Sequence, residues 1–346
     1  MRNFIFIFLL PGMLFAQSAS TVTYIPKHED LVYTFGGHPA KMHLKPGTTL
    51  ITWTEDCYDG AVKLPGDIPS KVITPGHDNP QTGPFYIDGA ELGDALAVHI
   101  IKLEPAREYA ISSSFPGFGA LTTTNYTALL HEPLEERVWF YKVDKVKNTV
   151  RYEAHKTKHA VDIPMRPFLG CIGVAPMHGE VRTTIVPEAF GGNMDTWQAC
   201  AGATVYLPVN VPGALFSIGD GHLAEGSGEI IGTAVEGALH VTLKIELIKK
   251  AQLSWPRIED DNYIMSAGSY RPLEDAARIA YNDLVRWIAA NYKMDLQDAY
   301  QLVSQTAETD LAQMVDPNYT VVVKMPKKYL PAGEVMNGMH RKMRIK

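Results

Sequence analysis

The residues best suited to catalysis in this chain of 346 residues lie between positions 191 and 236, where acidic residues, a histidine and glycines gather. An apolar run at 214–218 is followed by Asp220 and His222. Residues i and i+2 of an extended chain point to the same side, so this carboxylate and this imidazole should lie together. We expect Glu229 to open the next strand, where a hairpin would bring its carboxylate back toward His222.

This combination of side chains suits metal-assisted hydrolysis. Histidine with carboxylates is a usual ligand set for a catalytic zinc ion that keeps one position open. Such an ion lowers the pKa of its bound water to about 7 and polarises a carbonyl oxygen, and amide cleavage needs both effects. It also needs an acid for the departing nitrogen, for which Glu229 or Asp56 is the candidate. Spacing alone leaves open the ordinary alternative, in which the Gly-Asp and Asp-Gly pairs form turns and the histidine binds nothing.

Strands dominate the elements that must position these residues. Leu239–Leu247 alternates apolar and polar residues, as a strand with one face on a core does. Other runs rich in β-branched and aromatic residues cover 95–103, 138–143, 204–209 and 319–323. Helical spacing of apolar residues comes late, at 272–292 and 295–307. We therefore expect a mainly β fold, with a core like a β-sandwich or barrel and a later α+β segment containing two helices.

The chain divides into three parts by composition. Residues 1–20 have the pattern of a secretory signal peptide, because Arg2 precedes an apolar run, 4–15, that is too short to span a bilayer as a helix. Residues 21–254 should form the β-rich core, and residues 255–346 the α+β C-terminal segment packed on it. We expect a secreted or periplasmic protein with no stable membrane insertion after cleavage.

Charge and cysteine content exclude several classes of function. The formal charge of −6 is spread along the chain without a basic stripe, so nucleic acid is not an expected partner. The three cysteines include no CxxC pair and do not make a disulfide framework, which leaves one bridge open as an alternative. A thiol nucleophile would need a histidine and an orienting group beside it. Cys171 instead lies in an apolar stretch, where free cysteines are usually inert.

Several short stretches, in a fixed order along the chain, carry a resemblance to a known family. They are NPQTGP (79–84), GDALAV (93–98), PGFGAL (116–121), CIGVAP (171–176), GGNMD (191–195), VYLPV (205–209), GALFSIGDGH (213–222) and GSGE (226–229). Together they resemble the motifs of the acetamidase/formamidase family. The agreement runs from about residue 50 to residue 247, which is more than half of the chain. A set of ordered motifs is far more specific than any one of them.

The resemblance implies a β-rich, sandwich-like fold with an α+β portion, and it makes residues 21–254 the amidase core. Members hydrolyse formamide, acetamide or related small linear amides to a carboxylic acid and ammonia, and relatives act on other amides, including a lactam. A cyclic-amide hydrolase is therefore the first alternative. A catalytically inactive, exported β-sandwich binding protein is the alternative from another class. We expect a small amide as substrate and a homo-oligomer, most simply a dimer.

Site residues carry over from the family motifs position by position. His222, Asp220 and Asp195 are the expected ligands of a divalent metal ion, with zinc as the first expectation and calcium as the second. Glu229 and Asp56 are the expected catalytic acids. The division of the carboxylates between metal binding and proton transfer is left open by the sequence.

Three further residues are expected to contact substrate, namely Asn79, Asn193 and Trp197. Trp197 stands where members of the family commonly carry lysine, so a bulky ring replaces a cation. Ser227 stands in place of an acidic residue in what is usually G-D-G-E. Both departures predict a substrate that differs from those of typical members.

Overall fold

The computed structural model describes residues 20–122 and 134–344, and its fold is mainly β, as predicted. The predicted signal peptide, apart from Ser20, lies outside the described residues. Two large sheets carry most of the strands, and neither closes into a barrel within the described residues. A small third sheet pairs β2 (Thr34–Phe35) with β12 (Arg182–Thr183).

The first large sheet has nine strands and includes strands from both the N-terminal and the C-terminal parts of the described chain. Its order is β1 (Thr21–Thr23), β4 (Thr49–Thr54), β17 (Leu239–Ile248), β6 (Ala95–Pro105), β14 (Thr204–Pro208), β18 (Arg257–Glu259), β19 (Tyr263–Tyr270), β21 (Tyr319–Pro326) and β20 (Glu308–Gln313). The C-terminal strands therefore continue the sheet of the core through the pairing of β14 with β18. The division of the chain at residue 254 stays a prediction.

The second large sheet has ten strands and carries most of the site. Its main path is β10 (Ala160–Pro164), β9 (Thr149–Glu153), β8 (Arg137–Asp144), β7 (Tyr109–Ser114), β16 (Val235–Glu236), β15 (Phe216–Ala224), β11 (Phe168–Gly173) and β13 (Gly191–Asn193). The remaining two strands, β5 (Gln81–Ile87) and β3 (Met42–Leu44), join beside β15. All nine residues of β15 are buried, as expected for a strand with neighbours on both edges.

The alternating pattern predicted for the strand at 239–247 is confirmed in β17. Leu239, Val241, Leu243 and Ile245 are buried, whereas His240 is exposed. Since successive side chains of a strand point to opposite faces, β17 turns one face to the core and the other to solvent.

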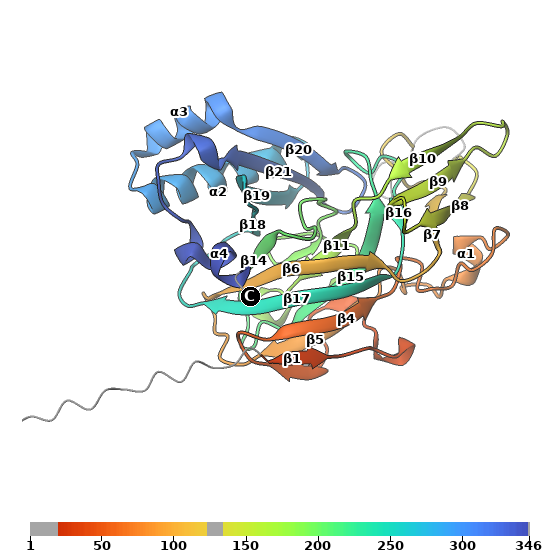
Figure 1. The fold of residues 1–346 in the computed structure, drawn as a ribbon, viewed down its shortest axis with the longest axis horizontal. Helices are drawn as coiled ribbons and strands as arrows, with labels where there is room; N and C mark the ends of the chain where they lie inside the picture. Colours follow the sequence, from red (N-terminus) through yellow and green to blue (C-terminus); the bar gives the residue numbers. More distant parts are fainter. Residues whose placement is uncertain (1–19, 123–133, 345–346) are drawn as a thin grey trace, which may run out of the picture.

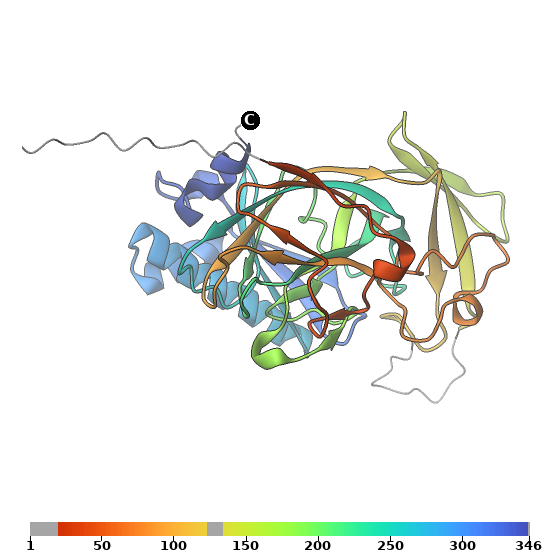
Figure 2. The same cartoon turned by 90° about the horizontal axis from the view of Figure 1, so that it is seen from below.

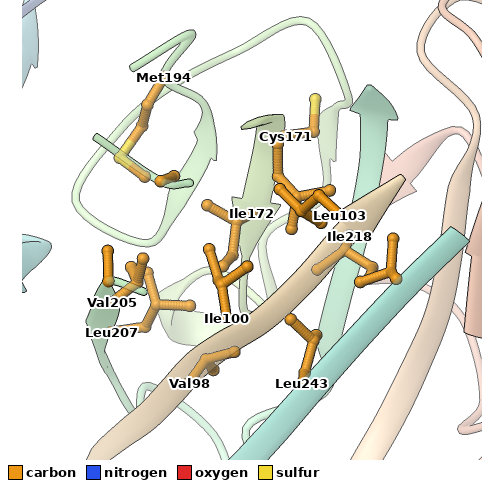
Figure 3. Packing of buried hydrophobic residues seen from close by; sticks show 14 of the residues in the cluster. Val98, Ile100, Leu103, Cys171, Ile172, Met194, Val205, Leu207, Ile218 and Leu243 are labelled. Atoms are coloured by element: carbon orange, nitrogen blue, oxygen red, sulfur yellow. The ribbon is translucent and has the colours of Figure 1, made fainter. Parts of the chain in front are cut away.

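The core between the two large sheets is apolar and closely packed. Val98 and Ile100 of β6 and Leu243 of β17 belong to one cluster with Ile172 of β11 and Ile218 of β15 (Figure 3). Each of these side chains is removed from solvent. Burial of such a side chain contributes roughly 1.5–3 kcal/mol, so this core fixes the strands on which the site is built.

The C-terminal segment contains the two predicted helices, α2 (Leu273–Tyr292) and α3 (Leu296–Thr306). They lie at one end of the molecule, and strands β8–β10 lie at the other (Figure 1; Figure 2). Asp295 caps α3, because its side chain accepts hydrogen bonds from the backbone N–H groups of Gln297 and Asp298.

Two short helices were not indicated by the sequence, α1 (Pro69–Val72) and α4 (Met339–Arg344). Their four and six residues are too few to establish a helical period. In the part of the chain that the structure describes, no helix has both the length and the apolar character needed to cross a membrane.

Candidate active site

Strand β15 carries the two residues from which the site was predicted. The sequence placed the end of the strand before Asp220 and His222, but both lie inside β15, which continues to Ala224. The predicted convergence of their side chains is observed, since His222 Nε2 lies 3.3 Å from Asp220 Oδ2. Asp220 has a left-handed backbone with φ of 55°, which a non-glycine residue adopts rarely.

Three more carboxylates surround His222. Asp195 follows β13, and its Oδ1 lies 3.8 Å from His222 Nε2. Glu236 is paired with His222 across β15 and β16, and its Oε2 lies 3.3 Å from the same nitrogen. On the other side of the ring, His222 Nδ1 donates to Glu225 Oε2 at 2.8 Å. This hydrogen bond leaves Nε2 directed toward Asp195, Asp220 and Glu236, as a metal-binding histidine requires.

Two loops complete the cluster. Glu229 does not open a strand, contrary to the prediction, but lies in the loop between β15 and β16 with φ of 47°. That loop meets the end of β20 through a bridge between Gly228 and Gln313, and Asp316 lies in the loop that follows β20. The meeting brings Asp316 to the site, where it offers a carboxylate oxygen within 4.8 Å of ligand atoms of Asp195 and Glu229.

A cavity of about 310 Å³ opens onto this cluster. Four acidic residues of the cluster line it, Asp220, Glu229, Glu236 and Asp316. Apolar side chains line it as well, among them Phe115, Pro116, Phe118 and Ile185. The cavity thus combines a polar region suited to a reacting group with an apolar wall suited to a hydrocarbon group.

Asn79 and Asn193 also line the cavity, at the polar region. Asn79 Nδ2 donates to Asn193 Oδ1 at 2.9 Å and to Asp220 Oδ2 at 3.3 Å. Asn193 Nδ2 donates to Asp316 Oδ2 at 2.6 Å. These amides therefore orient two of the acids, and contact with substrate stays a prediction for both.

Burial changes the protonation of the cluster. It raises the pKa of Asp195, Glu229 and Glu236 well above the usual range of a carboxyl group. Burial alone would lower the pKa of His222, but the carboxylates of Glu236 and Asp220 outweigh it and hold that pKa well above its ordinary value. In the absence of a cation, the cluster consequently retains protons that exposed carboxyl groups would lose.

The cluster has the features of a site built for a cation. Both carboxylate oxygens of Asp195 are buried, no N–H group in the described part of the chain donates to them, and the carboxyl group of Asp316 is their hydrogen-bond neighbour. A methyl group placed on Gly170 would lie 2.4 Å from Asp220 Oδ2, 2.7 Å from Asp195 Oδ1 and 2.9 Å from His222 Nε2. The glycine thus leaves free the space between three ligand atoms, and His222, Asp195 and Asp220 fit a divalent ion.

Asp56 and Trp197 were predicted in the site but are not among the residues that line the cavity. Arg107 donates to Asp56 Oδ2 at 2.5 Å, while Asp56 Oδ1 accepts from the backbone N–H groups of Tyr58 and Gly60. These contacts hold the Asp56 carboxylate in the turn, while burial raises its pKa to about 7, and a role as proton donor stays a prediction. The ring of Trp197 packs against the guanidinium of Arg166, 3.8 Å from the ring centre.

The cysteines do not form a nucleophilic site. Cys171 is fully buried, as predicted, and burial raises the pKa of its thiol well above the usual range. Cys57 lines the cavity, but burial and the nearby Glu236 and Asp220 raise its thiol pKa as well. A thiol nucleophile requires the opposite shift.

Three residues of the cluster were missed by the sequence analysis, namely Glu225, Glu236 and Asp316. Glu225 lies at i+3 from His222 beyond the strand pattern, and Glu236 lies on the adjacent strand. Asp316 belongs to the C-terminal segment and has no local motif. The sequence signal for Glu236 was the hairpin expected after His222, because a residue on the returning strand can pair with His222, as Glu236 does.

Comparison with known proteins identifies the family. A sequence model of the Acetamidase/Formamidase family matches residues 37–181 and 177–330. The chain belongs to this family. The resemblance predicted from the ordered motifs is thereby confirmed, and the family match extends into the C-terminal segment that supplies Asp316.

Solved structures of acetamidases share the whole fold. An acetamidase from Yersinia enterocolitica is 40% identical, with a TM-score of 0.85 over 92% of this chain and 95% of that chain. An acetamidase from Bacillus halodurans is 27% identical, with a TM-score of 0.79 over 94% of this chain and 100% of that one.

Curated relatives match over shorter stretches. The acetamidase of Mycolicibacterium smegmatis is 23% identical over 261 residues, which are 61% of this chain and 64% of that relative. The curated relatives that the chain matches are thus aligned over less than two thirds of their own length.

Proposed function

We propose that this chain hydrolyses the C–N bond of a small linear amide to a carboxylic acid and ammonia, using metal-activated water. Membership of the Acetamidase/Formamidase family supports amide hydrolysis. The observation that carries the metal is the space in front of Gly170, bounded by three ligand atoms from His222, Asp195 and Asp220. Zinc is the ion that this ligand set suits first, and calcium the second.

A divalent ion bound there supplies polarisation of the amide carbonyl and a water of lowered pKa. Glu225 fixes the imidazole by accepting from Nδ1, so Nε2 keeps its lone pair for the ion. Asn79 donates to Asp220 Oδ2 and holds this carboxylate in the cavity wall. The apolar wall, with Phe115 and Phe118, receives the hydrocarbon part of the amide and excludes water from it.

Glu229 is the acid that protonates the departing nitrogen in this proposal. It lines the cavity, and burial together with Glu225 raises its pKa well above the usual range. A carboxyl group of raised pKa holds its proton to a higher pH than a surface glutamate does, and it can then give the proton to a leaving group. Asp56, the other predicted acid, is less suited because Arg107 and two backbone N–H groups occupy its oxygens.

The proposal includes export directed by residues 1–20, an extracytoplasmic place of action and assembly into dimers. Sequencing of the N-terminus of protein recovered outside the cytoplasm would test the first two points. A molecular mass of the monomer in solution would contradict the third.

The test of the reaction is ammonia release from formamide, acetamide and propionamide, with metal analysis of the same protein. His222→Ala should no longer bind the ion, and its kcat/KM should fall at least about 10³-fold. A metal Lewis acid stabilises the transition state by several kcal/mol, and this stabilisation would be lost. His240→Ala, on the exposed face of β17, is the matched control and should keep both. Full activity and full metal content in His222→Ala would refute the mechanism.

The same assay separates the alternatives. Ring opening of a lactam in preference to linear amides would move the chain to cyclic-amide hydrolysis. Folded, metal-loaded protein that turns over no amide would instead favour a binding function.

A further inference from the structure

Cys57, Asp220 and Glu236 converge in the cavity beside the three residues proposed to hold the catalytic ion. One ligand atom from each lies within 4.8 Å of the other two. All three residues line the cavity. They come from separate places, since Cys57 lies in the turn after β4 while Asp220 and Glu236 lie on β15 and β16. The fold therefore brings a sulfur and two carboxylates together at the surface that substrate would meet.

Asp220 Oδ1 has no hydrogen-bond partner among the described residues, and the contact of Glu236 Oε2 is the ion pair with His222 Nε2, 3.3 Å away. Each residue is only 2% exposed. The other oxygens are occupied, because Asp220 Oδ2 accepts from Asn79 and Glu236 Oε1 accepts from the backbone N–H of Ala234 at 2.6 Å. Buried carboxylate oxygens left without a donor are costly unless a cation or a proton satisfies them.

The turn that carries Cys57 is held in place on both sides. Asp56 Oδ1 accepts from Tyr58 N at 3.0 Å and from Gly60 N at 3.1 Å, and Arg107 binds its other oxygen. The carbonyl of Cys57 accepts from Asn79 N at 3.1 Å. The thiol is consequently presented to the cavity by a fixed backbone, as a ligand must be.

A single divalent ion does not balance the charge of the cluster. The overlapping sets of candidate ligands contain one imidazole and six carboxylates, from Asp195, Asp220, Glu225, Glu229, Glu236 and Asp316. The remaining negative charge must be offset by retained protons or by a second cation. Asp220 belongs both to the set with His222 and Asp195 and to the set with Cys57 and Glu236.

We propose that Cys57, Asp220 and Glu236 form a second cation site, with Asp220 bridging the two ions. A thiolate with two carboxylates suits zinc better than calcium, because calcium takes oxygen ligands. The thiol releases its proton to solvent as the sulfur–metal bond forms. With both ions bound, one would lower the pKa of the attacking water and the other would polarise the amide carbonyl, while Glu229 would still protonate the departing nitrogen. This proposal rests on the proposed function, because the first ion shares Asp220.

The test uses cobalt(II) in place of zinc in the full-length, metal-stripped protein. We expect two equivalents of cobalt per chain and an intense thiolate-to-cobalt absorption in the near ultraviolet. Cys57→Ser should lose this absorption and one equivalent, while the other equivalent remains. Cys200→Ser makes the same change at a thiol outside every candidate ligand set, and it should keep both equivalents and the absorption.

Glu236→Gln provides a second variant if Cys57→Ser does not fold, and it should also bind one equivalent instead of two. One equivalent in the unaltered protein, with amide hydrolysis intact, would overturn the second site and leave the proposed function standing. Two equivalents without the thiolate absorption would overturn the role of Cys57. Folded protein that binds no ion but hydrolyses amides would overturn both metal sites.

Discussion

Two groups of buried carboxylates lie near Cys57, and they are stabilised in different ways: Glu55 and Asp56 precede it in the chain, and Asp220 and Glu236 share its candidate ligand set. Glu55 and Asp56 share Arg107, whose Nη1 lies 2.7 Å from Glu55 Oε1 and 2.5 Å from Asp56 Oδ2. Around His222, the acids share that single imidazole, whose Nε2 lies 3.3 Å from Glu236 Oε2 and 3.8 Å from Asp195 Oδ1, and Asp220 Oδ1 has no hydrogen-bond partner among the described residues. A buried carboxylate needs a counter-charge. Where the protein does not provide one, it leaves room for an ion.

The largest effect on metal binding and activity is expected from Gly170→Ala, which tests whether an ion takes the place of a counter-charge around His222. The added methyl group would occupy the space between the ligand atoms of His222, Asp195 and Asp220 without removing any of them. We expect metal content to fall to zero at the first site and kcat/KM for acetamide to fall at least about 10³-fold. Metal analysis and ammonia release measure both quantities.

Gly226→Ala is the matched control for Gly170→Ala. No atom lies within 4 Å of a methyl group placed there, so metal content and activity should be unchanged. An active, metal-loaded Gly170→Ala protein would show that the ion does not lie where we propose.

Removal of the Arg107 guanidinium from the pair Glu55 and Asp56 should lower the stability of the fold and leave metal binding unchanged. Arg107→Met leaves Glu55 and Asp56 buried without their partner, which typically costs about 3–5 kcal/mol. Urea denaturation of the metal-stripped protein measures this loss. The first ion should still bind, because Arg107 has no contact with His222, Asp195 or Asp220 among the described ion pairs. Lys102→Met, which alters an exposed pair with Glu104, should cost under about 1 kcal/mol.

The pH dependence of stability tests whether the carboxyl groups around His222 hold protons when no ion is bound. Burial raises the pKa of Asp316 from 3.8 to about 7, and that of Glu225 from 4.5 to about 7. Between about pH 4 and pH 7 these two carboxyl groups bind more protons in the folded, metal-free chain than in the unfolded chain, so their contribution to stability should fall as the pH rises. Urea midpoints at pH 5 and pH 8, in the presence of a chelator, measure this trend.

Saturating zinc should weaken or reverse the same trend, because the ion replaces protons at the cluster and stabilises only the folded chain. An identical pH dependence with and without zinc would mean that no ion binds there.

The smallest effect is expected at Trp197. Its ring packs on Arg166 and does not line the cavity, so Trp197→Phe should change kcat/KM for acetamide by less than about threefold. Loss of part of the cation–π contact should lower stability by about 1 kcal/mol. A tenfold change in KM would restore Trp197 as a contact to substrate.

Local patterns predicted the elements and the centre of the site. The alternation in β17 and the i, i+2 spacing of Asp220 and His222 depend only on neighbours in the chain, and both predictions agree with the structure. The prediction that Glu229 opens a strand assumed a hairpin directly after His222. The loop after β15 is longer than a tight hairpin, and spacing in the sequence does not reveal this length. Asp56 was matched to a motif, but its partner Arg107 is 51 positions away in the chain.

The balance of charge around a carboxylate is set by such distant contacts. For that reason the sequence did not distinguish Asp56, which has an arginine, from Asp195, which has none. Trp197 shows the same limit, because a motif gives the position of a residue but not the direction of its side chain.

The bridge between Gly228 and Gln313 has a consequence for the order of folding. The bridge joins the loop that carries Glu229 to the end of β20, just before Asp316, and contacts so distant in sequence form slowly. High affinity for an ion should therefore arise only after the C-terminal strands have joined the first sheet. Uptake of metal would then report completed folding, and a chain still being assembled would not capture ions with half of its ligands.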